Sequence, residues 1–236
     1  MSAESYLSDQ NLSALRWGGW AGMLGSFILL FVFGFLAVLV GLDTLDIEAE
    51  ILRYPDIRAA RVIENTLYLA ATALWMVHAV TLLISLRRTA LAPALAGCVF
   101  MGLGLVILAT GAIPHTMTDP VADLYHAPGV TPEGQAVLVS IWHAIQGIVD
   151  TLVITGIALT SVGMGFLSVA MLRSPGYGAW TGTVGILLAV AGTGSAIMSL
   201  IDPSDIIAVG VFALIFFQII AGWKTLRFAG FSAGTA

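Results

Sequence analysis

Six long apolar stretches, separated by short polar breaks, make up almost all of the 236-residue chain. Each approaches or exceeds the roughly 20 residues that a helix needs to cross the hydrocarbon core of a bilayer. Segments such as SFILLFVFGFLAVLVGL lack the alternation of a barrel strand, so helices are the only way to satisfy the backbone in lipid. The sequence therefore predicts an all-α polytopic membrane protein, a single domain over residues 1–236 with six transmembrane helices. The predicted spans are 17–42, 62–86, 91–113, 136–172, 179–201 and 206–223.

The composition agrees with a membrane protein and excludes several kinds of site. The chain is 58% hydrophobic and 10% charged, against about 25% charged residues in a soluble domain. Cys98 is the single cysteine, which excludes an intrachain disulfide and a cysteine-based zinc site. The sequence contains no nucleotide-binding glycine loop and no HExxH motif. We expect the lipid bilayer as the main surroundings and no nucleic acid among the partners.

Charged residues divide between the two sets of span ends. One set of ends carries Arg16, Arg87, Arg88, Arg173, Lys224 and Arg227. The other carries Asp43, Asp46, Glu48, Glu50, Asp56, Asp119, Asp123, Glu133, Asp202 and Asp205. By the positive-inside rule the basic side is cytoplasmic. This predicts a multi-pass protein of a bacterial cell (inner) membrane, with both termini in the cytoplasm and the acidic loops outside.

The first acidic loop, residues 43–61, is predicted to contain a short amphipathic helix on the outer surface. Ile47, Ile51 and Leu52 fall on one helical face, with acids on the other. Pro55 is expected to end this helix near Tyr54.

The second acidic loop holds the strongest concentration of possible metal ligands. His115, Asp119 and Asp123 are spaced four apart, and His126 follows three residues later. On a continuous helix these side chains would share a face and could bind zinc or copper. The alternative is a solvated polar loop, because the spacing matches no fixed metal motif.

The fourth stretch predicts an outward-facing polar site. At about 55 Å as a straight helix, it either projects from the membrane or breaks near Gly147. His143, Gln146 and Asp150 share one face of it, and Asp150 is expected to be the deepest acid. The alternative is a polar stripe that neighbouring helices satisfy.

The second span is expected to supply the opposite wall of this site. Glu64 and Tyr68 lie on one of its faces, and Arg61 can pair with Glu64 one turn away. The candidate ligand-binding set consists of Glu64, Tyr68, His143, Gln146 and Asp150.

His78 lies in the inner half of the second span and is interpreted as a buried neutral histidine. A haem held by His78 and His143 is disfavoured because the two lie at different depths. No cofactor is clearly implied, although a metal is compatible with the second acidic loop.

Small residues predict how the helices pack. Gly18 and Gly22 are four apart, as are Gly178 and Gly182. Such spacing lets helix backbones approach closely. It indicates packing within the bundle or, alternatively, the seam of a homodimer.

Three segments resemble a family of six-span bacterial membrane proteins of unknown function. They are RVIENTLYLAA at 61–71, MLRSPGYGAWTGTVGILLAVAG at 171–192 and the tail GWKTLRFAG. The resemblance implies a six-helix bundle and no established activity.

No complete catalytic constellation is present in the sequence. The leading hypothesis is a non-catalytic membrane protein: an accessory subunit of a larger complex, or a small-ligand binder with an outward-facing polar site. The alternative is a membrane enzyme or transporter that uses the outer-side histidines and carboxylates, with or without a metal. Homo-oligomerisation is compatible with either hypothesis.

Overall fold

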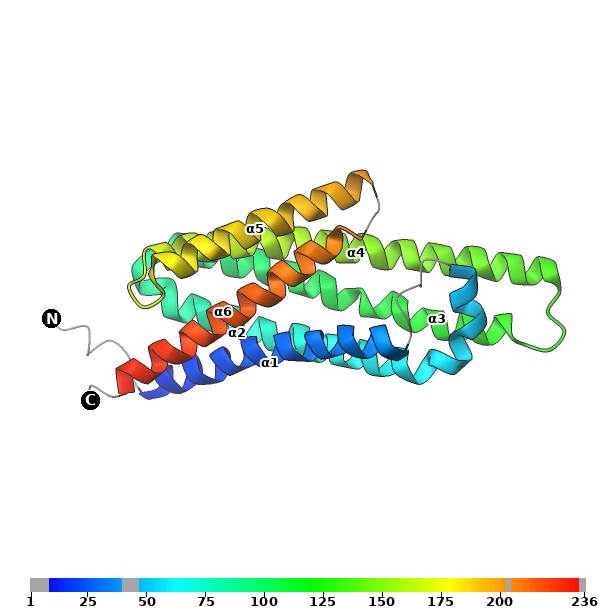
Figure 1. Cartoon of the computed structure of the whole chain (residues 1–236), viewed down its shortest axis with the longest axis horizontal. Helices are drawn as coiled ribbons and strands as arrows, with labels where there is room; N and C mark the ends of the chain where they lie inside the picture. Colours follow the sequence, from blue (N-terminus) through cyan, green and yellow to red (C-terminus); the bar gives the residue numbers. More distant parts are fainter. Residues whose placement is uncertain (1–8, 40–46, 203–204, 234–236) are drawn as a thin grey trace.

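The computed structural model describes residues 9–39, 47–202 and 205–233, which form helices joined by short turns, with no strand among them. The helices are α1 (Asp9–Leu39), α2 (Ile47–Thr110), α3 (Ala112–Tyr125), α4 (Pro132–Leu172), α5 (Gly178–Ile201) and α6 (Ile207–Ala233) (Figure 1). Within these residues, five helical segments are long and apolar enough to cross a membrane. The prediction of an all-α architecture compatible with a multi-pass membrane protein is confirmed. The predicted end of the first span at residue 42 lies outside the described residues.

The long α2 is a hairpin of two antiparallel arms. Its backbone leaves helical geometry at Ala90, with φ −155° and ψ 61°. The Tyr68 hydroxyl donates to the Leu108 carbonyl at 3.0 Å, and Asn65 reaches the Ala112 carbonyl at 3.5 Å. Residue numbers rise on one arm as they fall on the other, so the chain doubles back at the predicted break. Pro93 fits there, because its missing N–H costs nothing in the first turn of a helix.

The second arm of α2 packs against α4 through glycines on both helices. A Cβ atom on Gly163 would lie 2.5 Å from the Met101 backbone nitrogen, and one on Gly104 would lie 2.7 Å from the Gly156 carbonyl oxygen. Only glycine permits such close approach of two backbones.

The glycines of α1 and α5 that the sequence singled out also face helices of the same chain. Gly18 and Gly22 of α1 lie against Thr81 and His78 of α2, and Gly182 of α5 lies against Leu172 of α4. Gly18, Gly22 and Gly182 therefore pack within the bundle, whereas a Cβ atom on Gly178 would meet nothing within 4 Å and its φ of 77° fits the turn before α5. The homodimer stays a prediction.

Apart from the first turns of α2, the helices run roughly along one axis, with two different ends (Figure 1). α1 starts and α6 finishes at the end that also holds the α2 hairpin turn and the α4–α5 turn. This is the basic end, with Arg16, Arg87, Arg88, Arg173, Lys224 and Arg227. The opposite, projecting end consists of residues 49–61 of α2, α3, and residues 132–148 of α4.

α4 is 41 residues long and uninterrupted, so it spans roughly 61 Å. The sequence allowed either a helix that projects beyond the other spans or one that breaks near Gly147. The structure has the continuous, projecting helix. Thr131 begins α4, accepting a hydrogen bond from the Gly134 backbone N–H at 3.2 Å, and Pro132 occupies the first turn. α3 runs alongside this extension, since Gln135 donates to the Tyr125 carbonyl at 3.4 Å.

The predicted outer-surface helix differs from the structure in where it ends. Pro55 lies inside α2 and does not terminate it. The first turns of α2 lie across the bundle axis in Figure 1 before the helix joins the first arm. Their buried face consists of Ile51, Tyr54 and Ile57, and Leu52 is exposed.

Candidate functional site

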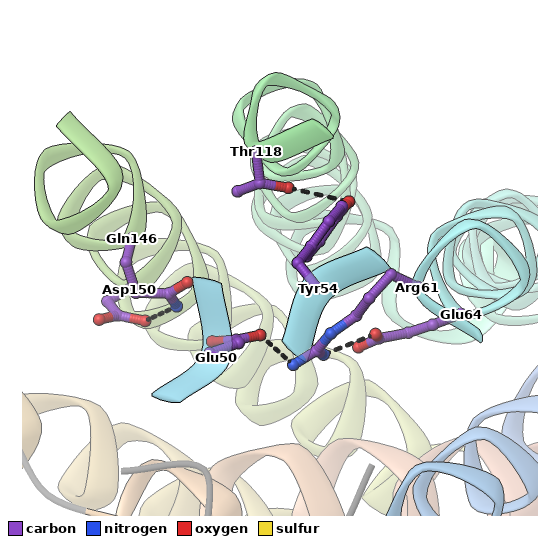
Figure 2. A network of polar contacts seen from close by, with 7 residues as sticks. All are labelled: Glu50, Tyr54, Arg61, Glu64, Thr118, Gln146 and Asp150. Atoms are coloured by element: carbon purple, nitrogen blue, oxygen red, sulfur yellow. Dashed lines mark hydrogen bonds and ion pairs between the residues drawn. The ribbon is translucent and has the colours of Figure 1, made fainter. Parts of the chain in front are cut away.

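The projecting end has a hydrophobic core of its own, separate from that of the bundle. It is built from Ile51, Tyr54, Ile57, Val121, Ala122, Trp142 and Ile145. The rings of Tyr54 and Trp142 meet edge to face, with centroids 5.2 Å apart. The Thr118 hydroxyl donates to the Tyr54 hydroxyl oxygen at 3.3 Å (Figure 2). The first turns of α2 are therefore fixed between α3 and α4.

His126 supplies the hydrogen bond that the Ile51 carbonyl lacks because Pro55 has no backbone N–H. A proline lacks the N–H that would bond to the carbonyl four residues earlier, and for Pro55 that carbonyl belongs to Ile51. The Nε2 atom of His126 lies 3.0 Å from the Ile51 oxygen. Because a carbonyl only accepts, Nε2 carries the proton. This bond joins the C-terminus of α3 to the start of α2 and explains how α2 continues through Pro55.

Two arginines of α2 neutralise carboxylates at the projecting end. Arg58 bonds to Asp119 at 2.7 Å and also to Asp123, both on α3. These three side chains are at least 39% exposed.

Arg61 forms the more buried of the two clusters. It pairs with Glu64 at 2.8 Å, as the sequence predicted, and also with Glu50 (Figure 2). Its three side chains are no more than 20% exposed. Burial opposes the charge on Arg61, but the Glu64 and Glu50 carboxylates more than offset it and raise the pKa of Arg61 above its ordinary value.

The candidate metal ligands have other partners in this structure. Asp119 and Asp123 both face Arg58, and His126 donates from Nε2 to a carbonyl. α3 supplies the continuous helix that a metal site would need, but the His115 side chain lies outside the described part. Among the described side chains, no three of His, Cys, Asp or Glu come together as metal ligands. The zinc or copper site stays a prediction.

The candidate ligand-binding residues divide into two sets. On α4, Gln146 donates to Asp150 at 3.0 Å (Figure 2), and His143 and Asp150 are exposed. On α2, Glu64 bonds to Arg61, and Tyr68 donates to Leu108. The described hydrogen bonds and ion pairs do not join one set to the other.

The helix register places Asp150 at the level where α5 ends. Gly104 packs against Gly156, and Gly192 packs against Ser161. Continuing these antiparallel registers, with Leu152 against Gly111, sets Asp150 at the level where α3 begins and close to Asp202 at the end of α5. Asp150 therefore lies near the end of the bundle, at the base of the projecting end, and not at its middle.

His78 is fully buried in the bundle and belongs to a polar chain between α1, α2 and α6. Its Nδ1 bonds to the Gln218 side-chain oxygen, and the Gln218 amide nitrogen lies 3.6 Å from the Met101 sulfur. Nearby, Trp75 Nε1 donates to the Ser26 hydroxyl at 3.2 Å. By register through Met101 and Gly163, His78 and His143 lie about 30 Å apart along the axis.

Sequence reasoning missed the role of Arg58 and the partner of His78. The sequence prediction gives Arg58 no role, although it pairs with two acids spaced four apart on one helix face. Gln218, a lone polar residue in an apolar span, is the kind of signal that could have marked the His78 contact.

Comparisons with known proteins return no relatives: no family model, no curated protein and no solved structure matches this chain. The function is therefore argued from the molecule alone.

Proposed function

We propose that the chain is a six-span protein of a cell membrane, with both termini cytoplasmic, that binds a small ligand or a partner subunit and performs no catalysis. The two arms of α2 count as separate crossings because each reaches the roughly 20 residues required. Together with α1, α4, α5 and α6 they make an even number of crossings, which agrees with α1 starting and α6 finishing at the basic end (Figure 1). The positive-inside rule assigns that end to the cytoplasm.

The topology can be tested by labelling single cysteines in intact cells. Cysteines replacing Ser8 and Glu133, in a Cys98→Ala background, are expected to react with a membrane-impermeant reagent from opposite sides. Glu133 is exposed in the first turn of α4, so its replacement disturbs no buried contact. Labelling of both from the same side would overturn the proposed topology.

The observation that carries the binding proposal is the length of α4. The helix is about twice as long as a crossing requires, and its extension is held rigid by a second hydrophobic core. That extension exposes His143 and Asp150, with Gln146 bonded to Asp150. Meanwhile, Arg58 and Arg61 hold four of the neighbouring carboxylates in ion pairs. This division favours a rigid polar binding surface over a reactive centre.

Purification in mild detergent followed by mass spectrometry tests this proposal. A stoichiometric partner protein or a retained small molecule is expected, and Asp150→Asn should release it without lowering the yield of folded protein. Glu133→Gln removes a carboxylate from the same helix extension and should retain it. If elemental analysis or the visible spectrum showed a bound metal or chromophore instead, the membrane enzyme or transporter would replace this proposal.

A further inference from the structure

The first and last helices meet along a line of close backbone contact. A Cβ atom on Gly19 would lie 2.9 Å from the Gly222 carbonyl oxygen, and one on Gly222 would lie 2.8 Å from the Gly19 carbonyl oxygen. About two turns further along, the Ser26 hydroxyl donates to the Ile215 carbonyl at 3.3 Å. α1 and α6 are therefore antiparallel. We call their line of contact the seam; at the basic end it is formed by Gly19 and Gly222.

Exposed side chains repeat on both sides of this seam in mirrored order. The mirrored set consists of Arg16, Trp20, Phe27 and Phe31 on α1 and of Arg227, Trp223, Phe216 and Phe212 on α6. Both helices show arginine, tryptophan, phenylalanine and phenylalanine at steps of 4, 7 and 4 residues, in chain order on α1 and in reverse on α6. The six aromatic side chains are between 39% and 59% exposed, and both arginines are exposed.

The mirrored set lies on one face of the α1–α6 pair. Trp20 directly follows Gly19, and Trp223 directly follows Gly222. Each tryptophan is therefore rotated by about 100° from the line of contact, in the same sense. For antiparallel helices in contact, equal rotations lead to the same side of the pair. Phe33 and Phe212 have ring centroids 5.6 Å apart, so aromatic residues of the two helices meet across the seam.

Positive charge is concentrated where this face reaches the basic end of the bundle. The Arg227 guanidinium carbon lies 4.4 Å from the centroid of the Trp223 ring, and the Lys224 ammonium lies 5.6 Å from it. The register through Gly19 and Gly222 places Arg16 at the level of Arg227. By helix rise, the tryptophans lie about 6 Å deeper than the arginines, and the phenylalanines about 16 and 22 Å deeper.

We propose that the mirrored set, together with Lys224, binds one anionic phospholipid. The lipid phosphate lies between Arg16 and Arg227, whose guanidinium groups suit its oxygens. Trp20 and Trp223 lie at the interfacial level where tryptophan is favoured. The acyl chains follow the seam over Gly19 and Gly222, between the two rows of phenylalanines.

The charge on this face favours a lipid over a second copy of the chain. Two copies facing each other here across a twofold axis normal to the membrane would bring both copies of Arg16 and Arg227 to one level. Juxtaposed like charges oppose such an interface. An anionic headgroup supplies the opposite charge, and the cytoplasmic leaflet, where the basic end is proposed to lie, is rich in anionic lipid. The inference rests on the membrane location and not on the polar surface of α4.

Thermal unfolding in a neutral detergent, with lipid titrated in, tests the site. Phosphatidylglycerol is expected to raise the Tm, and phosphatidylcholine to raise it far less. Replacing both arginines, Arg16→Gln with Arg227→Gln, should weaken the apparent affinity for phosphatidylglycerol about thirtyfold. The matched control, Arg87→Gln with Arg173→Gln, removes equal charge from exposed residues at the same end and should behave like the parent.

Three outcomes would overturn the proposal. The first is an equal rise in the Tm of the parent protein with either lipid. The second is an equal loss of affinity for phosphatidylglycerol in the control variant, which would indicate diffuse charge attraction. The third is disulfide dimerisation of a Trp20→Cys variant, in a Cys98→Ala background, that is unaffected by phosphatidylglycerol. If the glutamine pair does not fold, Arg16→Lys with Arg227→Lys decides, because it keeps the charge but loses the planar fork. Partial loss of affinity supports the site, and unchanged affinity overturns it.

Discussion

The bundle and the projecting end are held together by different means. In the bundle, helix backbones meet at glycines, as at Gly163 against Met101 and Gly19 against Gly222. At the projecting end, the elements meet through an aromatic core around Trp142 and through ion pairs of Arg58 and Arg61. Lipid gives no hydrophobic drive for helices to associate, so close packing must supply it. In water, burial of large apolar side chains supplies it instead.

Hydroxyl groups bond in both ways in the bundle. Thr81, Thr160 and Ser168 donate to carbonyls one turn earlier on their own helices, whereas Ser26 donates to the Ile215 carbonyl of α6. At the projecting end, the Thr118 hydroxyl joins α3 to α2. The two regions therefore differ in glycine packing against aromatic and ionic contacts, and substitutions at those contacts should affect them differently.

The largest effect is expected from adding a side chain at the α2–α4 contact. A Cβ atom on Gly163 would lie 2.5 Å from the Met101 backbone nitrogen, so Gly163→Val should prevent recovery of folded, monodisperse protein in size-exclusion chromatography. Gly194, whose Cβ would meet nothing within 4 Å, is the control, and Gly194→Ala should gain up to about 1 kcal/mol from helix propensity. Normal recovery of Gly163→Val would contradict glycine-mediated packing.

Removing the central aromatic residue of the projecting end should unfold that region and leave the bundle intact. Trp142→Ala is expected to cost about 3 to 5 kcal/mol of local stability, because it empties the core against Tyr54. Hydrogen exchange should rise in residues 49–60 and in α3, with protection in α5 and α6 unchanged. Exchange that rises uniformly over all helices would show that the two regions form one cooperative unit.

Replacing Arg61 and replacing Arg58 should cost different amounts of local stability, because the two side chains differ in burial. Arg61→Met leaves Glu50 and Glu64 facing each other with little water, and should cost about 2 kcal/mol of local stability. Arg58→Met affects exposed, solvent-screened pairs and should cost less than Arg61→Met. Limited proteolysis near the start of α2 measures both. Equal protection in the two variants would show that burial does not decide the strength of these clusters.

The smallest effect is expected at the bond between His126 and Ile51. His126→Leu leaves that carbonyl without a donor, which should cost about 1 kcal/mol. The same substitution in a Pro55→Ala background should cost almost nothing, because alanine restores the helical N–H. Local hydrogen exchange of the four variants gives the coupling. Additive effects would mean that His126 does not compensate for Pro55.

The sequence predicts the helices better than it predicts their contacts. Apolar length and the polar break at Arg87 and Arg88 are local signals, so the spans and the α2 hairpin follow from them. Pro55 is predicted to end a helix, because His126, which donates to the Ile51 carbonyl in place of the missing proline N–H, lies far along the chain. The two acids on α3 matched a metal pattern, whereas their observed partner is Arg58. Long-range partners are what a local pattern does not contain.

The seam between α1 and α6 also constrains how the chain is made. A membrane protein is synthesised from its N-terminus, and Gly222 lies about 200 residues after Gly19, so their contact forms only after the intervening helices have been made. Until then α1 packs on α2 through Gly18 and Gly22. Closure of the bundle is therefore a late event with high contact order. Truncation before α6 should leave a nascent chain whose first helix is half covered, a natural substrate for membrane quality control.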